Sequence, residues 1–282
     1  MNALRVLLLA SAMLSGASLY AAPANVNLND AHLDYVNLQG GLIRSVLPPD
    51  GRDAKAYVAP FRMRAVPVSN AEFLAFVRAN PSWQRDRIVR LLALPSYLRH
   101  WGGALQLASN TLGPNKLNPG SNRPDQPVTQ VSWFAADAYC KAEGGRLPTW
   151  HEWEFAAADA TRRDAREDPL WRDRILRWYS RPSTDPLPRV GQSPRNIYGV
   201  RDLHGVVWEW VDDFNGIMLS GDNREQGDPD LLKFCGAGAA SVQDRDNYAV
   251  LMRLAMLSSL QARYTTANLG FRCVREIKGA KR

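Results

Sequence analysis

The sequence predicts a globular protein in which short strands, capped helices and long irregular segments are mixed. Three observations support this: an ordinary composition, extended segments near the N-terminus, and Ser or Thr capping signals ahead of apolar stripes. The 282 residues are 45% hydrophobic and 22% charged, which argues against a disordered, collagen-like or coiled-coil chain. The formal charge of +7 is spread along the chain apart from a short basic tail at 278–282, so nucleic-acid binding is not expected.

The first 24 residues have the layout of a secretory signal peptide. Arg5 gives a short positive region, residues 6–19 are uncharged and mostly apolar, and small residues near Ala21 and Ala24 supply a cleavage site between residues 21 and 24. The alternative is an uncleaved anchor, although the apolar run is short for a bilayer span. We therefore expect an exported protein, in the simplest case periplasmic, with no stable membrane insertion after cleavage.

The N-terminal third is expected to hold short strands followed by two helices. Extended segments are predicted at 33–38, 41–47 and 57–63. Ser69 then has Glu72 three residues later, the capping-box pattern that opens a helix. A second, basic helix is expected over 85–94, ended by Pro95.

Two further helices are predicted from their own boundary signals. Ser132 caps a helix through Glu143, which two following glycines end, and Thr149 opens a helix through Ala158. Two long segments are expected to be irregular: residues 102–127, rich in Asn, Gly and Pro, form a loop expected at the rim of a binding cleft, and residues 160–195 connect the helices to the densest motif. A short strand is expected near the C-terminus.

Several kinds of chemistry lack their usual motifs. The four histidines are scattered and form neither H-x-x-x-H nor H-E-x-x-H, so a zinc site built on histidine pairs is not expected. No C-x-x-C, G-x-S-x-G or P-loop is present. Cys140, Cys235 and Cys273 are an odd set for an oxidising compartment, which suggests one bridge and one free thiol; sequence alone allows three pairings.

The densest motif is Trp208-Glu-Trp210, which follows Asp202 and Gly205. One interpretation is a group of core aromatics around a turn. The other is a hard-cation site, in which the Asp202 and Glu209 carboxylates close around backbone carbonyls of the turn between them. Spacing alone does not separate the two.

Five ordered motifs resemble the formylglycine-generating enzyme, or sulfatase-modifying factor, family. They are Pro127-Val-Thr-Gln-Val-Ser-Trp133 with Ala138-Tyr-Cys140, Gly145-Arg-Leu-Pro-Thr149 with Glu152-Trp-Glu-Phe-Ala156, Tyr198-Gly-Val-Arg-Asp-Leu-His-Gly205, Val207-Trp-Glu-Trp210, and Asn268-Leu-Gly-Phe-Arg-Cys273. The resemblance covers roughly residues 33–276 and implies a single domain over residues 25–282. It also implies an α+β fold related to C-type lectins, with little regular secondary structure.

The resemblance implies two structural features. The family's disulfide falls on Cys140 and Cys273. Its calcium site falls on the Asp202 and Glu209 side chains with the Gly205 and Val207 carbonyls, so calcium is the expected cofactor.

The resemblance does not supply the family's copper chemistry. The two copper-binding thiol positions fall on Asp244 and Ala249, and neither side chain is the soft thiolate that copper(I) prefers. Copper is therefore not expected, and catalytic residues are not identified. The candidate pocket consists of Trp208, Ser241, Asp244 and Arg253, whereas Cys235 lies upstream of the pair.

Three functional classes follow from this resemblance. The favoured class is an exported accessory or maturation factor, because the chain looks most like family members encoded with copper nitrite reductases; Arg99–Trp101, Asp212–Asn215 and Cys235–Gly238 carry that likeness. The alternative is an oxidase without copper thiolates, such as a siderophore-chromophore maturation enzyme. A genuine formylglycine-generating oxidase is the least favoured. Whether the chain is an enzyme stays open, and the expected partner is a periplasmic protein or small molecule.

Overall fold

The computed structural model describes residues 34–43, 45, 55–107, 123–158, 169–179, 186–215, 253, 255–257 and 259–277. The signal-peptide segment, most of the expected loop at 102–127, and the positions Cys235, Ser241, Asp244 and Ala249 lie outside these ranges. The strands are β1 (Tyr35–Leu38), β2 (Gly41–Ile43), β3 (Ala56–Val58), β4 (Phe61–Arg64), β5 (Trp208–Glu209), β6 (Leu269–Gly270) and β7 (Val274–Glu276). The helices are α1 (Asn70–Ala79), the 3₁₀ turn η2 (Pro81–Trp83), α2 (Trp133–Ala142), α3 (Trp150–Ala157) and α4 (Pro169–Tyr179).

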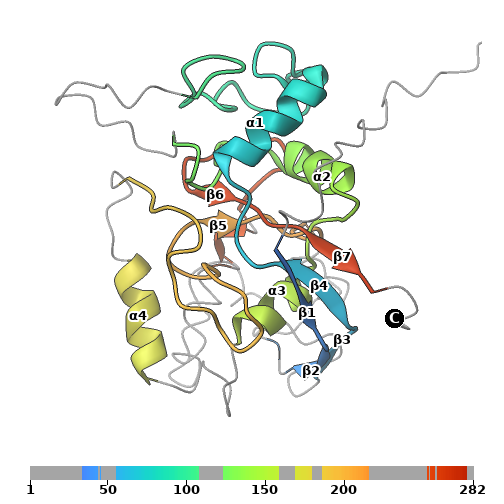
Figure 1. Ribbon diagram of the computed structural model, residues 1–282, viewed down its shortest axis with the longest axis vertical. Coiled ribbons are helices and arrows are strands. Elements are labelled where there is room, and N and C mark those ends of the chain that lie inside the picture. The colour runs from blue at the N-terminus through green and yellow to red at the C-terminus, as the bar shows by residue number, and fades with distance from the viewer. Residues whose placement is uncertain are drawn as a thin grey trace, which may run out of the picture.

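Strands from both ends of the described chain meet in one sheet. Its order is β1-β4-β7, and both pairings are antiparallel. A second antiparallel pair, β2 with β3, lies at one end of the molecule, and the short parallel pair β5 with β6 lies near the sheet (Figure 1). The expected extended segments at 33–38, 41–47 and 57–63 therefore contribute β1, β2, β3 and β4, in shorter pieces than the sequence suggested.

Three helices begin at the residues their capping signals indicate. The Ser69 hydroxyl accepts from the Glu72 amide while the Glu72 carboxylate accepts from the Ser69 amide (2.7 Å), which is a complete capping box. Thr149 opens α3 in the same way, and Ser132 caps α2 through the Ala135 amide. Helix α2 ends at Ala142 because Gly144 adopts a left-handed conformation (φ +76°), so those predictions are confirmed to within a residue.

The predicted basic helix at 85–94 is wrong. The chain forms η2 and then a series of turns, in which the Leu92 amide bonds the Val89 carbonyl and the Leu94 amide bonds the distant Arg263 carbonyl, both at 2.9 Å. A tertiary contact thus replaces the helical hydrogen bond. Leu91, an apolar residue within this segment, is 77% exposed.

The prediction that 160–195 is irregular is also wrong in part, because α4 lies within it. Proline is tolerated at the first position of a helix, where its missing N–H has no helical partner, so Pro169 does not prevent α4. Among the described side chains of α4, Ile175 is the buried one, whereas Leu170 and Leu176 are exposed, so the apolar residues of this segment do not mark one buried helix face.

The core is rich in aromatic side chains. Phe73 packs against Phe76, Tyr139 and Phe271, with ring centroids 5.4–6.0 Å apart. This cluster joins α1, α2 and the segment between β6 and β7, so it ties the helical side of the domain to the sheet.

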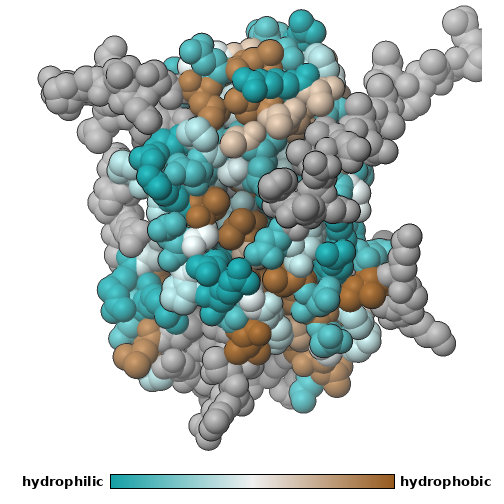
Figure 2. Space-filling model, viewed as in Figure 1, coloured by the Kyte–Doolittle hydropathy of each residue, from teal (hydrophilic) through white to brown (hydrophobic). Residues whose placement is uncertain are grey.

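No helix in the described part of the chain is long and apolar enough to cross a membrane. Figure 2 shows hydrophobic colour reaching the surface near β2 and β3, where the cross-strand pair Leu42 and Tyr57 is exposed.

Candidate functional site

The turn that leads into β5 is held in place by Asp202. This residue has a left-handed backbone (φ +60°), a conformation that Asp tolerates better than most residues. Its carboxylate accepts from the backbone amides of Gly191 and Ser193, the latter at 3.1 Å. Its own amide donates to the Ser193 hydroxyl at 2.7 Å. Asp202 therefore fastens the segment at 191–193 to the turn.

Glu209, in β5, forms a fully buried ion pair with Arg272. The Arg272 Nη2 donates to Glu209 Oε1 at 2.8 Å and Nε donates to Oε2 at 2.9 Å, and both side chains are 0% exposed. The Trp153 indole also donates to this carboxylate, from Nε1 to Oε2 at 2.8 Å. Arg272 also donates to the main-chain carbonyls of Arg64, Ala65 and Arg201, so both buried charges are compensated.

The Asp202 and Glu209 carboxylates do not fit the calcium site that the family resemblance implied. Calcium needs several oxygens directed at one point, but the Asp202 and Glu209 oxygens accept from N–H groups on separate parts of the fold. Arg272 supplies the positive charge that the sequence interpretation assigned to the ion. Among the described residues, no group of three or more His, Cys, Asp or Glu side chains could hold a metal ion.

Arg253, a member of the candidate pocket, lies beneath the turn. It is 1% exposed, and its Nη2 donates to the Glu209 carbonyl oxygen at 2.6 Å. Its Cζ lies 3.6 Å from the centroid of the Trp153 ring, a close cation–π contact. Arg253 thus supports the turn from the core side.

His204 lies beside the same Trp153 ring. The two rings meet edge to face with centroids 5.2 Å apart. Burial lowers the pKa of His204 to about 3, and the nearby positive charges of Arg253, Arg174 and Arg272 act in the same direction. The imidazole is therefore neutral at physiological pH.

Of the two members of the predicted pocket that the structure describes, Trp208 is the half-buried one. Its ring is half-buried and packs against the half-buried Trp178 of α4, with centroids 5.3 Å apart. Gly205, in the turn before β5, has a backbone (φ +102°) that L side chains rarely adopt, and a β-carbon there would lie in ordinary van der Waals contact with the Trp178 ring, at 3.9 Å. The structure thus places Trp208 next to Glu209 in β5 and Arg253 against the Glu209 carbonyl, while Ser241 and Asp244 lie outside the described residues.

Cys140 and Cys273 form a disulfide, as the family resemblance implied. Their sulfur atoms are 1.99 Å apart, their Cα atoms are 5.4 Å apart, and both residues are fully buried. The bond joins α2 to the start of β7, next to the isolated bridge between Arg146 and Val274. Because the sequence has three cysteines, Cys235 is the only thiol left.

Comparison with known proteins gives consistent results. A family model described as the sulfatase-modifying factor enzyme 1-like domain matches residues 25–277. The formylglycine-generating enzyme of Streptomyces coelicolor is 30% identical over 252 residues, covering 77% of this chain and 78% of the relative. The inactive C-alpha-formylglycine-generating enzyme 2 of Bos taurus is 28% identical over 278 residues, covering 87% and 89%.

Two further proteins match less of their length or less closely. The hercynine oxygenase of Mycolicibacterium thermoresistibile is 32% identical over 173 residues, which cover 55% of this chain and 36% of that relative. The solved structure of PvdO from Pseudomonas aeruginosa superposes with a TM-score of 0.44 at 17% identity, covering 86% of this chain and 94% of that one.

Proposed function

Because the chain belongs to the family of the sulfatase-modifying factor enzyme 1-like domain, we propose that it is an exported accessory or maturation factor. In this role it binds its target on the family fold and works without the copper–thiolate chemistry of a formylglycine-generating enzyme. The target is a periplasmic protein or small molecule, and a copper nitrite reductase is the partner we propose to test first.

One observation carries this proposal: the fold consumes two of the three cysteines. With Cys140 and Cys273 joined in a buried disulfide, Cys235 has no second thiol with which to hold copper(I). Copper(I) sites in proteins rely on soft thiolate or thioether ligands, and Asp244 and Ala249 occupy the counted thiol positions. Relatives named as inactive indicate that the fold is also used without the oxidase activity.

The turn before β5 supports a binding role. The buried network of Glu209, Arg272 and Arg253 fixes its backbone, so the Trp208 and Trp178 rings are held at the surface at little further entropy cost. Rigid aromatic side chains of this kind are common anchors in recognition surfaces.

Two of the three segments that resemble the nitrite-reductase-associated members, Arg99–Trp101 and Asp212–Asn215, lie in the described part of the chain and have structural roles there. The Trp101 indole donates to the Asn70 side-chain oxygen at 3.0 Å, and the Asp213 carboxylate accepts from the Trp150 amide at 2.7 Å at the start of α3. These contacts hold the two segments in the framework of this fold.

Deletion of the gene in its native host tests the proposed partner. We expect the periplasmic nitrite reductase to be made at normal levels but with at least severalfold lower activity, restored by the wild-type gene. A Trp208→Ala variant that folds but does not restore activity would link the effect to the turn. Normal reductase activity in the deletion strain would rule out this partner.

The second candidate, an oxidase without copper thiolates, is favoured by the likeness to a hercynine oxygenase. The chain matches about a third of that relative, so the rest of that protein has no counterpart in the match. Oxygen consumption by the purified protein, stimulated by a periplasmic extract and absent with extract alone, would favour the oxidase over the accessory role.

A further inference from the structure

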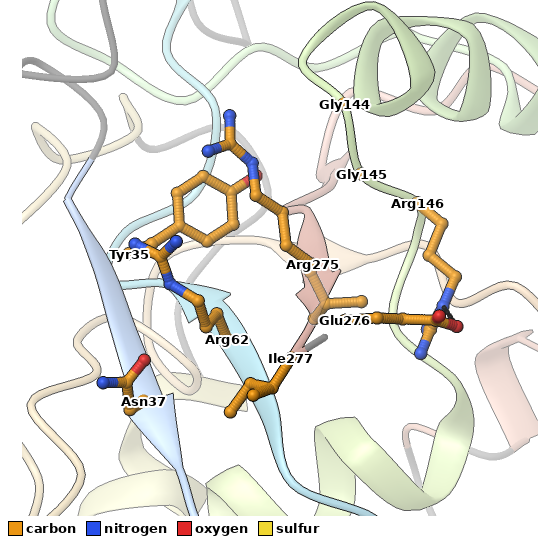
Figure 3. A pocket seen from close by; sticks show the side chains of 10 residues that line it. Tyr35, Asn37, Arg62, Gly144, Gly145, Arg146, Arg275, Glu276 and Ile277 are labelled. Atoms are coloured by element: carbon orange, nitrogen blue, oxygen red, sulfur yellow. Dashed lines mark ion pairs between the residues drawn. The ribbon is translucent and has the colours of Figure 1, made fainter. Parts of the chain in front are cut away.

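A second feature, separate from the Trp208 turn, is a groove over one face of the β1-β4-β7 sheet. It has a volume of about 970 Å³, and the turn after α2 forms one of its walls (Figure 3). Its lining residues are Tyr35, Asn37, Arg62, Gly144, Gly145, Arg146, Val274, Arg275, Glu276 and Ile277. None of them belongs to the network around Glu209.

Two arginines stand directly opposite each other on this sheet face. In the antiparallel register of β4 and β7, Arg62 is the partner of Arg275, and Asn37 of β1 is the partner of Arg62 on the other side. Like charges directly opposite on neighbouring strands destabilise a sheet. The arrangement therefore calls for a compensating group.

Of these two arginines, Arg275 makes the closer contacts with groups of the protein that stabilise its charge. The Tyr35 ring lies 4.3 Å from the Arg275 Cζ and 5.7 Å from the Arg62 Cζ, and Figure 3 shows both side chains beside that ring. Arg275 also donates through Nη2 to the Glu143 carbonyl oxygen at 2.6 Å. Arg62 has the longer ring contact.

The nearby carboxylates are directed elsewhere. Glu143 accepts from the Tyr35 hydroxyl at 2.8 Å and also from Arg64 and Tyr139, beneath the groove. Glu276 lies 3.7 Å from the Arg146 Nε at the far wall. Among the described residues, no carboxylate lies within ion-pair distance of the half-buried Arg62 guanidinium.

We propose that this groove binds an organic oxyanion, a carboxylate or phosphate group on an apolar body, with the anion between Arg62 and Arg275. A guanidinium presents parallel N–H donors that match two oxygens of either group. The Tyr35 ring and the Ile277 side chain offer apolar surface to the rest of the ligand. The volume lies in the range of known small-molecule sites, and the inference does not depend on the proposed accessory role.

Calorimetric titration at low ionic strength tests the site with three probes of similar shape: benzoate, phenyl phosphate and the neutral benzamide. Benzoate and phenyl phosphate distinguish a carboxylate from a phosphate source. The variants are Arg62→Gln and, as the matched control, Arg87→Gln, which removes an exposed arginine from the turns after η2. We expect the wild type and Arg87→Gln to bind at least one anion, and Arg62→Gln to bind it at least ~10-fold more weakly.

A second readout separates binding from folding. Without ligand, Arg62→Gln should melt no lower than Arg87→Gln, because loss of the Tyr35 contact is offset by relief of the repulsion with Arg275. The proposal is overturned if neither anion binds, if benzamide binds as well as benzoate, or if Arg62→Gln binds like the wild type. A melting temperature for Arg62→Gln clearly below that of the control would also overturn it, since Arg62 would then be needed by the sheet itself.

Discussion

Replacement of Glu209 by Gln should be among the most destabilising single changes in this domain. The substitution keeps the size of the side chain but removes the charge that faces the Arg272 guanidinium across contacts of 2.8 and 2.9 Å. Arg272 is 0% exposed, so its charge cannot be solvated when its partner is lost. Breaking a buried pair in this way costs about 3–5 kcal/mol of unfolding free energy.

The assay is urea unfolding followed by circular dichroism, with an exposed ion pair as the control. Arg123 and Asp125 lie 3.3 Å apart with both side chains 40% exposed, so Arg123→Gln should cost at most about 1 kcal/mol. A Glu209→Leu, Arg272→Met double variant should lose less than the sum of its single variants, because it buries no charge. It should still be less stable than the wild type, since the carbonyls of Arg64, Ala65 and Arg201 lose a donor. If Glu209→Gln and Arg123→Gln unfold at similar urea concentrations, the buried network does not hold the turn.

Three further predictions follow from the same structure. The Cys140→Ser, Cys273→Ser double variant should lose about 5 kcal/mol of unfolding free energy, because the disulfide closes a loop of 133 residues. Non-reducing peptide mapping of the wild type should recover the linked peptides, and a wild type with three free thiols would refute the pairing. Millimolar calcium or EDTA should leave the melting temperature of the wild type unchanged, because N–H donors already surround Asp202 and Glu209, and a rise with calcium would restore the cation site. Burial, with a smaller contribution from Arg85, lowers the pKa of His100 to about 4, so between about pH 6.5 and 4 the unfolded state binds a proton that the native state does not. The free energy of unfolding should therefore fall as pH falls through this window, by up to about 1.4 kcal/mol per pH unit more in the wild type than in a His100→Asn variant. Equal slopes for the two proteins would contradict this.

Features with local signals were predictable from the sequence. A capping box needs two residues three positions apart, and both such patterns, at Ser69 and Thr149, open helices. The end of α2 also has a local signal, Gly144, because glycine is the residue that most easily adopts a left-handed backbone.

Features set by distant partners were not predictable from local patterns. The segment at 85–94 has the composition of a helix, but Leu94 bonds a carbonyl 169 positions later in the chain. Likewise, Glu209 pairs with Arg272, 63 positions later in the chain. Because that partner is not part of the turn, the sequence of the turn suggested a bound metal ion as the positive charge. The arginine in the Gly-Phe-Arg-Cys motif was the sequence signal for this pairing, since an arginine side chain can neutralise a buried carboxylate just as a metal ion can.

The register of Arg62 against Arg275 belongs to the same class. It depends on β7, from the end of the chain, lying beside β4. Neither residue stands out in the sequence, because each is one of 35 basic side chains and only the pairing makes their charges meet.

The proposed accessory role requires that the protein does not carry out copper–thiolate oxidation, and one measurement tests this directly. The purified protein is incubated with copper(I), oxygen and a Cys-x-Pro-x-Arg peptide, with the Streptomyces coelicolor formylglycine-generating enzyme as the positive control. Mass spectrometry should show the aldehyde product with the control enzyme and unchanged peptide thiol with this protein, since Cys235 has no partner thiol once Cys140 and Cys273 are joined. Copper-dependent formation of the aldehyde by this protein, lost in a Cys235→Ser variant, would contradict the account.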